Sequence, residues 1–262
     1  MRWAKEHPEV MRMTAEYVRS FRNEPDPVVA VAQNAETLEG KIAWVLLGSC
    51  LYQEIPLSVF RPLLESLFQK YPGERLWTFP LPTEAEIRGV VRRQVRSYSW
   101  QLEESVPGIF WSVGSFVRRR RSLKEWLENS QIPDVWRSLG EIFFMGKRAF
   151  RPKALWALSR LYSPFPRGLG ALREGAAVQT PVPFPYGLRS WIGIVGLGRD
   201  VGYAEMDEVG KRRLAASVCK ELSPGDPREA AHAFLFFRES PSAEPFFLQL
   251  KNFCLSRGGM PR

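Results

Sequence analysis

Apolar residues recur at three- and four-residue intervals along most of this chain, which is the spacing of amphipathic helices. The apolar positions of residues 9–22 lie close to one helical face, for example, and the same spacing returns repeatedly further on. β-Branched runs such as SWIGIVGLG are short and isolated. The sequence therefore predicts an all-α protein of about ten or more helices joined by short loops. The helices are expected at residues 9–22, about 38–53, 58–71, about 100–128 (continuous or broken near Pro107-Gly108), 134–145 and 152–162.

Three helix starts carry a recognisable capping pattern. Asp26 and Asp226 are each followed by proline, which suits an N-cap residue with proline at the first helical position. Thr83 and Glu86 have the spacing of a capping box, in which each side chain accepts a hydrogen bond from the other residue's backbone N–H. These pairs predict where helices begin more sharply than the apolar pattern does.

The composition indicates a folded, basic protein. Hydrophobic residues make up 45% and aromatic residues 13% of the chain, which is too apolar for a disordered one. The chain has 37 Lys and Arg against 28 Asp and Glu, a net charge of +9, and such an excess favours a polyanionic partner. Solubility alone is the other explanation for this charge.

The cysteines and histidines do not have the spacing of a metal site, so we expect no metal and no cofactor. Cysteines that are few and odd in number suit a reducing cytoplasm, and the N-terminal sequence has no apolar signal core. The longest apolar run is Ile42–Leu47, which is too short to cross a bilayer. The residues concerned are Cys50, Cys219, Cys254, His7 and His232.

A basic connection between two apolar helices is the strongest functional lead. In FFMGKRAFRPKALWALSRLY, residues 143–162, the cations Lys147, Arg148 and Arg151 precede a helix that opens with Pro152 and Lys153. The start of a helix carries free backbone N–H groups and a partial positive charge, so it can bind a phosphate. An ordinary corner between two helices, with its cations in solvent, is the alternative.

This segment resembles the hairpin of the helix-hairpin-helix DNA glycosylase superfamily, and archaeal 8-oxoguanine glycosylases have the most similar layout. Gly146 matches a turn glycine, and Lys153 matches the nucleophilic lysine of the bifunctional members. Two further segments match in order: WVLLGSCLYQEIPLSVFRPLLESLFQKYP, with Gln53 near its junction, and TPVPFPYGLRSWIGIVGLG. The resemblance covers most of residues 40–240. It implies that DNA is contacted by Gly146, Lys147, Arg148, Arg151 and Gln53.

The resemblance also implies a fold of two lobes. One helical lobe would combine residues 1–48 with 155–262. The other, a helical barrel over residues 49–154, would end in the helix-hairpin-helix at about 134–162.

One position departs from the family pattern. The family places an aspartate after the hairpin, where it supports departure of the base, and Pro185 occupies that slot here. No carboxylate lies between Glu174 and Asp200. The normal mechanism is therefore open to question in this chain.

Two groups of arginines and five aromatic residues can each be interpreted in two ways, as part of the fold or as nucleic-acid contacts. Arg118–Arg121, and the stripe of Arg88, Arg92 and Arg96, suit a solvated helix surface or a non-specific attraction for phosphate. Five aromatic residues suit the core more often than a base-stacking site. They are Trp44, Trp111, Phe144, Trp191 and Phe237.

The sequence thus leads to a hypothesis of base-excision repair. The expected enzyme is a monomeric DNA glycosylase with AP-lyase activity, in which Lys153 attacks C1′ of a flipped damaged nucleotide in double-stranded DNA. Two alternatives stay open: a catalytically inactive DNA-binding relative, and a helical module that binds an acidic protein.

Overall fold

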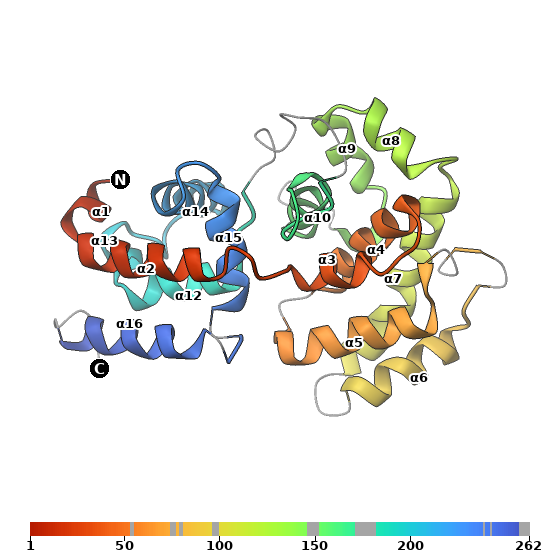
Figure 1. The fold of residues 1–262 in the computed structure, drawn as a ribbon, viewed down its shortest axis with the longest axis horizontal. Coiled ribbons are helices and arrows are strands. Elements are labelled where there is room, and N and C mark those ends of the chain that lie inside the picture. The colour runs from red at the N-terminus through yellow and green to blue at the C-terminus, as the bar shows by residue number, and fades with distance from the viewer. Residues whose placement is uncertain are drawn as a thin grey trace. The chain divides into compact units, whose positions relative to one another are not determined.

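The computed structural model describes residues 1–52, 55–73, 77–78, 81–95, 100–145, 152–170, 182–237, 239–241 and 243–256 of this 262-residue chain. These residues form fifteen α-helices and no strand, which confirms the all-α prediction. The chain divides into two compact units (Figure 1). Unit 1 comprises Met1–Glu24 and Val182–Arg262, and unit 2 comprises Pro25–Pro181.

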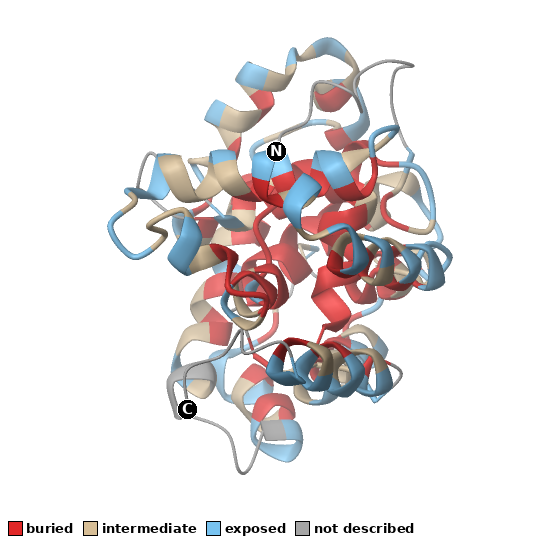
Figure 2. Ribbon diagram, turned by 90° about the vertical axis from the view of Figure 1, so that its left-hand side faces the viewer, coloured by how far each residue is buried: buried red, intermediate tan, exposed pale blue. Residues whose placement is uncertain are grey.

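Each unit is a set of helices joined by short connections. Unit 1 contains α1 (Arg2–Glu6), α2 (Pro8–Ser20), α12 (Tyr186–Ile194), α13 (Leu197–Asp200), α14 (Glu208–Leu222), α15 (Pro227–Phe236) and α16 (Glu244–Ser256). Unit 2 contains α3 (Pro27–Ala32), α4 (Leu38–Leu51), α5 (Leu57–Lys70), α6 (Glu84–Val95), α7 (Trp100–Arg118), α8 (Leu123–Asn129), α9 (Ile132–Leu139), the short 3-10 turn η2 (Phe143–Met145) and α10 (Pro152–Tyr162). Most helices carry buried residues on one side and exposed residues on the other (Figure 2).

Helix α4 is the centre of unit 2. Its residues from Ile42 to Leu51 are buried on every side, as expected for a helix that is apolar all round. It packs against α3, α7, α8 and α10, so four other helices share one core around it. Gly48 makes the approach of α3 possible, because a Cβ there would lie 2.6 Å from a methyl group of Val28.

A buried ion pair joins α10 to the start of α3. The Nε atom of Arg160 lies 2.9 and 3.0 Å from the two carboxylate oxygens of Asp26, and both side chains are 1% exposed. Arg160 Nη1 also donates to Ser49 Oγ, at 3.1 Å. Asp26 in turn accepts from the backbone N–H groups of Val28 and Val29 as the N-cap of α3. The pair therefore fixes α3, α4 and α10 to one another.

Unit 1 has an aromatic core in which polar atoms keep partners. Trp191 Nε1 donates to Thr14 Oγ1 at 3.0 Å, and the Tyr17 hydroxyl donates to the Ala233 carbonyl at 2.7 Å. Both bonds tie α2 to helices near the other end of the chain. At Gly187 a Cβ would lie 2.0 Å from the Phe234 carbonyl oxygen, so α12 and α15 approach closely there.

All three predicted helix caps are confirmed. The carboxylates of Asp26 and Asp226 accept from backbone N–H groups of the first turn, and both helices have proline at N1. In the capping box, Thr83 N donates to Glu86 Oε2 at 2.8 Å and Glu86 N lies 3.3 Å from Thr83 Oγ1. Local hydrogen bonding of this kind depends little on tertiary context, which is why sequence spacing predicts it.

Several predicted boundaries differ from those observed. Helix α7 continues through Pro107-Gly108, and the segment expected to continue to residue 128 instead ends at Arg118. A new helix, α8, starts because Ser122 Oγ accepts from Glu125 N at 3.1 Å, while the Glu39 carboxylate accepts from the N–H groups of Leu123 and Lys124. The helix expected over 134–145 ends at Leu139, and η2 follows it.

The two units also have boundaries other than those of the expected lobes. The expected division at residues 48 and 155 would separate α3 and most of α4 from α7, and would cut α10 near its start. The observed boundaries lie at 24/25 and 181/182. The packing of α4 gives the physical reason, since α4 contacts α7 and α8 as well as α3 and α10 and so holds all of them in one unit.

Loss of one partner of the buried pair should be strongly destabilising. In Arg160→Met the Asp26 carboxylate would stay buried without its counter-ion, at a cost of about 3–5 kcal/mol in the free energy of unfolding. The exposed Arg12, which pairs with Glu16, provides the matched control Arg12→Met, and its cost should be about 0–1 kcal/mol. Urea denaturation followed by circular dichroism measures both. Equal stability of the two variants would contradict this role for the pair.

Candidate functional site

Lys153 lies in the first turn of α10 and reaches the end of α4. Its Nζ atom donates a hydrogen bond of 2.8 Å to the backbone carbonyl of Cys50. That carbonyl is one of the last four of α4, which have no partner within their own helix. The contact spans 103 positions of sequence, and the packing of α10 against α4 makes it possible.

The Lys153 amine is partly buried, and its protonation is correspondingly disfavoured. Burial lowers the pKa of Lys153 below its ordinary value of 10.5, while the negative charge that the Cys50 thiol can carry opposes this effect. The positive end of the α10 helix dipole also disfavours a cation, whereas the carbonyl end of α4 favours one. A lysine with a lowered pKa supplies more of the neutral, nucleophilic amine at a given pH.

The direction of the shift fixes how Lys153 affects stability with pH. Because the folded pKa lies below the unfolded one, burying the protonated amine costs stability at pH values below the folded pKa. This cost decreases as the pH rises through the window between the two pKa values, and it is absent above the ordinary lysine pKa.

The thiol beside Lys153 is not a nucleophile. Burial raises the pKa of Cys50 to about 12, so this cysteine keeps its proton at neutral pH. Among the described residues, Cys50 is the one titratable group that acts electrostatically on Lys153, and no carboxylate does so. The described surroundings of the amine therefore contain a nucleophile but no neighbouring acid.

The other site residues expected from the resemblance lie outside the described residues. These are Gln53, Gly146, Lys147, Arg148 and Arg151. The structure consequently gives the position of α10 and of Lys153. The role of the other five residues as DNA contacts stays a prediction.

Carboxylates partly neutralise the predicted arginine stripe. Arg88 Nε donates to Glu84 at 2.9 Å and its Nη2 donates to Glu104 at 2.9 Å, which raises the pKa of Arg88. Arg92 is paired with Glu103. Arg96 lies outside the described residues. For Arg88 and Arg92 the structural interpretation is the better one, because they pair within α6 and with α7.

The arginine run at the end of α7 contains one half-buried member and three exposed ones. The guanidinium of Arg120 lies 3.5 Å from the centre of the Phe116 ring and 3.2 Å from the Glu141 carboxylate, so it is part of the fold. Arg119 also pairs with Glu141, at 3.5 Å. Arg118, Arg119 and Arg121 remain exposed to solvent.

The candidate aromatic residues also divide. Trp44, Trp191 and Phe237 are completely buried and belong to the core, but Trp111 is 50% exposed. Sequence reasoning missed Phe143, which is 61% exposed and is the first residue of η2. The apolar pattern gives no signal for it, because an apolar residue in a predicted helix is expected to face the core.

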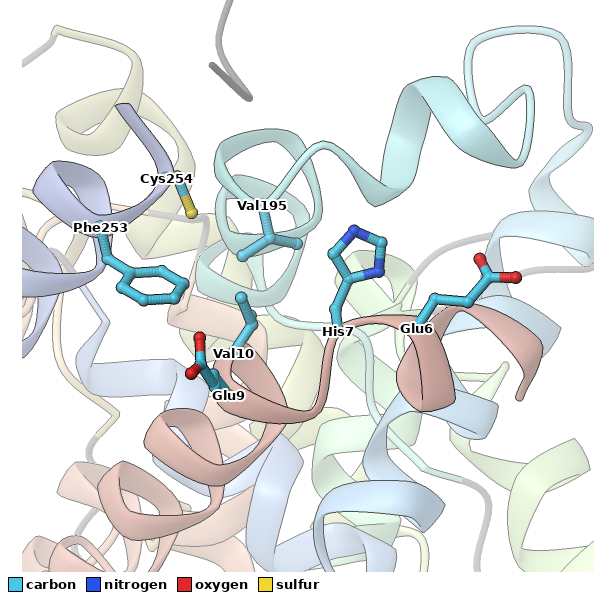
Figure 3. A pocket seen from close by; sticks show the side chains of 7 residues that line it. All are labelled: Glu6, His7, Glu9, Val10, Val195, Phe253 and Cys254. Atoms are coloured by element: carbon cyan, nitrogen blue, oxygen red, sulfur yellow. The ribbon is translucent and has the colours of Figure 1, made fainter. Parts of the chain in front are cut away.

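A hollow of about 270 Å³ lies within unit 1 and does not include Lys153. Val10, Val195 and Phe253 supply apolar walls, and Figure 3 shows the Cys254 sulfur and the Glu9 carboxylate beside them. The His7 ring stacks on Trp3, at 4.3 Å between ring centres, so it already has a structural partner. The hollow combines apolar and acidic walls without a group that identifies a ligand.

Pro185 occupies the position where the resemblance predicts an aspartate, and the described residues from Val182 to Arg199 contain no carboxylate. Pro185 is the N-cap of α12 and supplies no capping oxygen. Asp200 is exposed and accepts a hydrogen bond of 2.9 Å from Trp3 Nε1. Glu174 lies outside the described residues.

Comparison with known proteins identifies no relative of this chain. No protein-family model, curated protein or solved structure matches this chain. Within the part of the chain that is described, no cluster of His, Cys, Asp and Glu is arranged to hold a metal ion, and no helix is both long and apolar enough to span a bilayer.

Lys153 should titrate below the range of an ordinary lysine. Its burial disfavours the ammonium form, so the ¹³Cε resonance should shift at a lower pH than in an unfolded chain. NMR of ¹³C-lysine-labelled protein measures this, and the resonance is assigned by its loss in Lys153→Arg. A midpoint at or above the ordinary lysine pKa would show that the carbonyl of Cys50 outweighs burial.

Proposed function

We propose that this chain binds DNA at the α9–α10 connection and removes a damaged base, with Lys153 as the nucleophile of a DNA glycosylase with lyase activity. The observation that carries the proposal is the position of Lys153. A partly buried amine with a lowered pKa stands in the first turn of a helix, directly after a connection that contains three cations. The resemblance to the two-lobed helix-hairpin-helix glycosylases supports it.

Attack on C1′ of the sugar requires an amine that is neutral, because only the neutral amine has a free lone pair. The lone pair of Nζ forms a bond to C1′ of the sugar, while the electron pair of the glycosidic bond leaves with the base, which takes one proton from the amine. The C1′–O4′ bond then opens and O4′ takes a proton from water, leaving a protonated Schiff base on Lys153. Attack at C1′ requires the nucleotide to leave the duplex stack first.

DNA is the partner that the charge favours. The chain carries a net charge of +9, and Lys147, Arg148 and Arg151 stand immediately before α10. The amino end of a helix can hold a phosphate through backbone N–H groups and the helix dipole, and this grip is independent of base sequence. The family resemblance assigns the same task to this connection.

The second candidate is a DNA-binding relative without catalysis. Pro185 favours it, because the residue at the start of α12 has no side-chain oxygen to stabilise charge on the sugar. The absence of a carboxylate acting on Lys153 among the described residues favours it too. Such a protein would keep the phosphate grip and lose only the chemistry.

Borohydride trapping distinguishes the two candidates. Incubation of wild-type protein with lesion-containing duplexes and borohydride should give a covalent complex, since the reductant converts the Schiff base to a stable amine. Lys153→Gln should abolish this complex while its affinity for the duplex stays within about 3-fold of the wild type, because a single charge contributes little to binding through several phosphates. The exposed Lys124 provides the control Lys124→Gln, which should still be trapped.

Two results would contradict the enzymatic proposal. Trapping that persists in Lys153→Gln would assign the nucleophile to another amine. Duplex binding without trapping, across a wide panel of damaged bases, would favour the non-catalytic relative.

Duplex affinity should fall steeply as salt increases. If about four phosphates are neutralised, the slope of log K against log salt should be about −3.6, because each contact releases condensed counterions. Fluorescence anisotropy with duplexes of unrelated sequence measures the slope and should give similar values for each. A flat salt response would remove phosphate contacts as the source of affinity.

A further inference from the structure

Among the described residues of unit 2, three large aromatic side chains are exposed, and two of them, Trp111 and Phe143, lie on adjoining elements. Trp111 on α7 is 50% exposed, and Phe143 at the start of η2 is 61% exposed. Exposing a large aromatic face to water forgoes the free energy that its burial would contribute. Two such residues on adjoining elements therefore indicate a surface that meets another molecule.

Hydrogen bonding and packing anchor this surface to α7. The backbone N–H of Phe143 donates to Ser112 Oγ at 2.8 Å, and Ser112 is the residue next to Trp111. The neighbouring Phe144 ring packs on α7 at Gly108, where a Cβ would lie only 3.0 Å from the ring. Phe144 thus packs inward against the helix while Phe143 stays in solvent, with the two rings at 83° and 5.0 Å apart.

Exposed arginines lie at the carboxyl end of α7, and one of them shares the face of Trp111. Arg118 is seven residues after Trp111, so it shares a face of the helix at a distance of about 10 Å along the axis. Arg119 is exposed and pairs with Glu141, two residues before Phe143. Arg121 is also exposed. The exposed arginines of this run therefore follow Trp111 along α7 and beyond its end.

We propose that Trp111 and Phe143 stack on the bases of an unpaired nucleic-acid strand whose phosphates meet Arg118, Arg119 and Arg121. Aromatic platforms beside arginines bind single strands, because every base has a face that can stack and every phosphate carries charge. The interval of about 10 Å corresponds to about three stacked nucleotides. In an intact duplex the base faces are covered by their neighbours, so this surface prefers unpaired strands.

This surface goes beyond the duplex grip and the Lys153 chemistry. It rests on the proposed function only in taking nucleic acid as the partner. An acidic protein is the other partner that the charge fits. Carboxylates do not stack on aromatic rings, however, whereas nucleic-acid bases do. Single-strand binding through Trp111 and duplex binding through the α9–α10 connection are therefore separable by experiment.

The test measures affinity for a short fluorescein-labelled oligothymidylate by anisotropy, at one fixed salt concentration. Trp111→Ala and Phe143→Ala should each weaken binding about 10-fold, and the double variant more, since stacking contributes roughly 1–3 kcal/mol per base. Trp111→Phe should retain most of the affinity, because it keeps a ring. Leu248→Ala removes a side chain of similar exposure on α16 of unit 1 and should bind like the wild type.

Matched measurements separate this proposal from the preceding one. Lys153→Gln should bind the single strand normally even if it is never trapped on a duplex. Unchanged single-strand affinity in the Trp111→Ala/Phe143→Ala double variant would overturn the proposal. So would a wild-type chain that ignores the oligothymidylate and instead binds an acidic polypeptide such as polyglutamate, or forms a dimer that Trp111→Ala dissociates in light scattering.

Discussion

The buried pair of Asp26 and Arg160 is the constraint on which unit 2 depends. Two charges removed from water are costly unless each is paired and its remaining hydrogen-bonding capacity is satisfied. Here Asp26 accepts from the guanidinium and from two backbone N–H groups, while Arg160 also reaches Ser49. Since these groups come from α3, α4 and α10, only one arrangement of the three helices satisfies all of them at once. Asp26 N also donates to the Pro166 carbonyl, which adds the chain after α10 to the same arrangement.

This arrangement also determines where Lys153 lies. Lys153 and Arg160 are seven residues apart on α10, and therefore share one face of that helix. Arg160 bonds Ser49 on α4, and Lys153 bonds the carbonyl of the next residue, Cys50. The ion pair fixes the rotation of α10 about its axis, so the amine is directed at the carbonyl end of α4 and kept partly out of water. The structural charge pair thus helps to hold the Lys153 amine where burial lowers its pKa.

Features set by residues close in sequence were predicted better than features that depend on residues far apart in the chain. The capping residues Asp26, Thr83 and Asp226 were identifiable because their bonds close within three residues. The arginines show the limit: four-residue spacing places Arg88 and Arg92 on one face of α6, but their partners Glu103 and Glu104 belong to α7. The end of α7 at Arg118 could not be predicted either, since Glu39, more than eighty residues away, caps the helix that follows.

The candidate site shows the same contrast between local and distant signals. Lys153 was identifiable from its position after Pro152, but its burial and its bond to Cys50 depend on α4, about a hundred residues earlier. Counting cations gives Arg88 and Arg118 equal weight as phosphate contacts. The structure distinguishes them by their surroundings, because two carboxylates hold Arg88, whereas Arg118 is exposed on the face of α7 that carries Trp111. The net charge of a chain thus describes its overall attraction for a polyanion, but ion pairing and exposure within the fold determine how each cation can contribute to it.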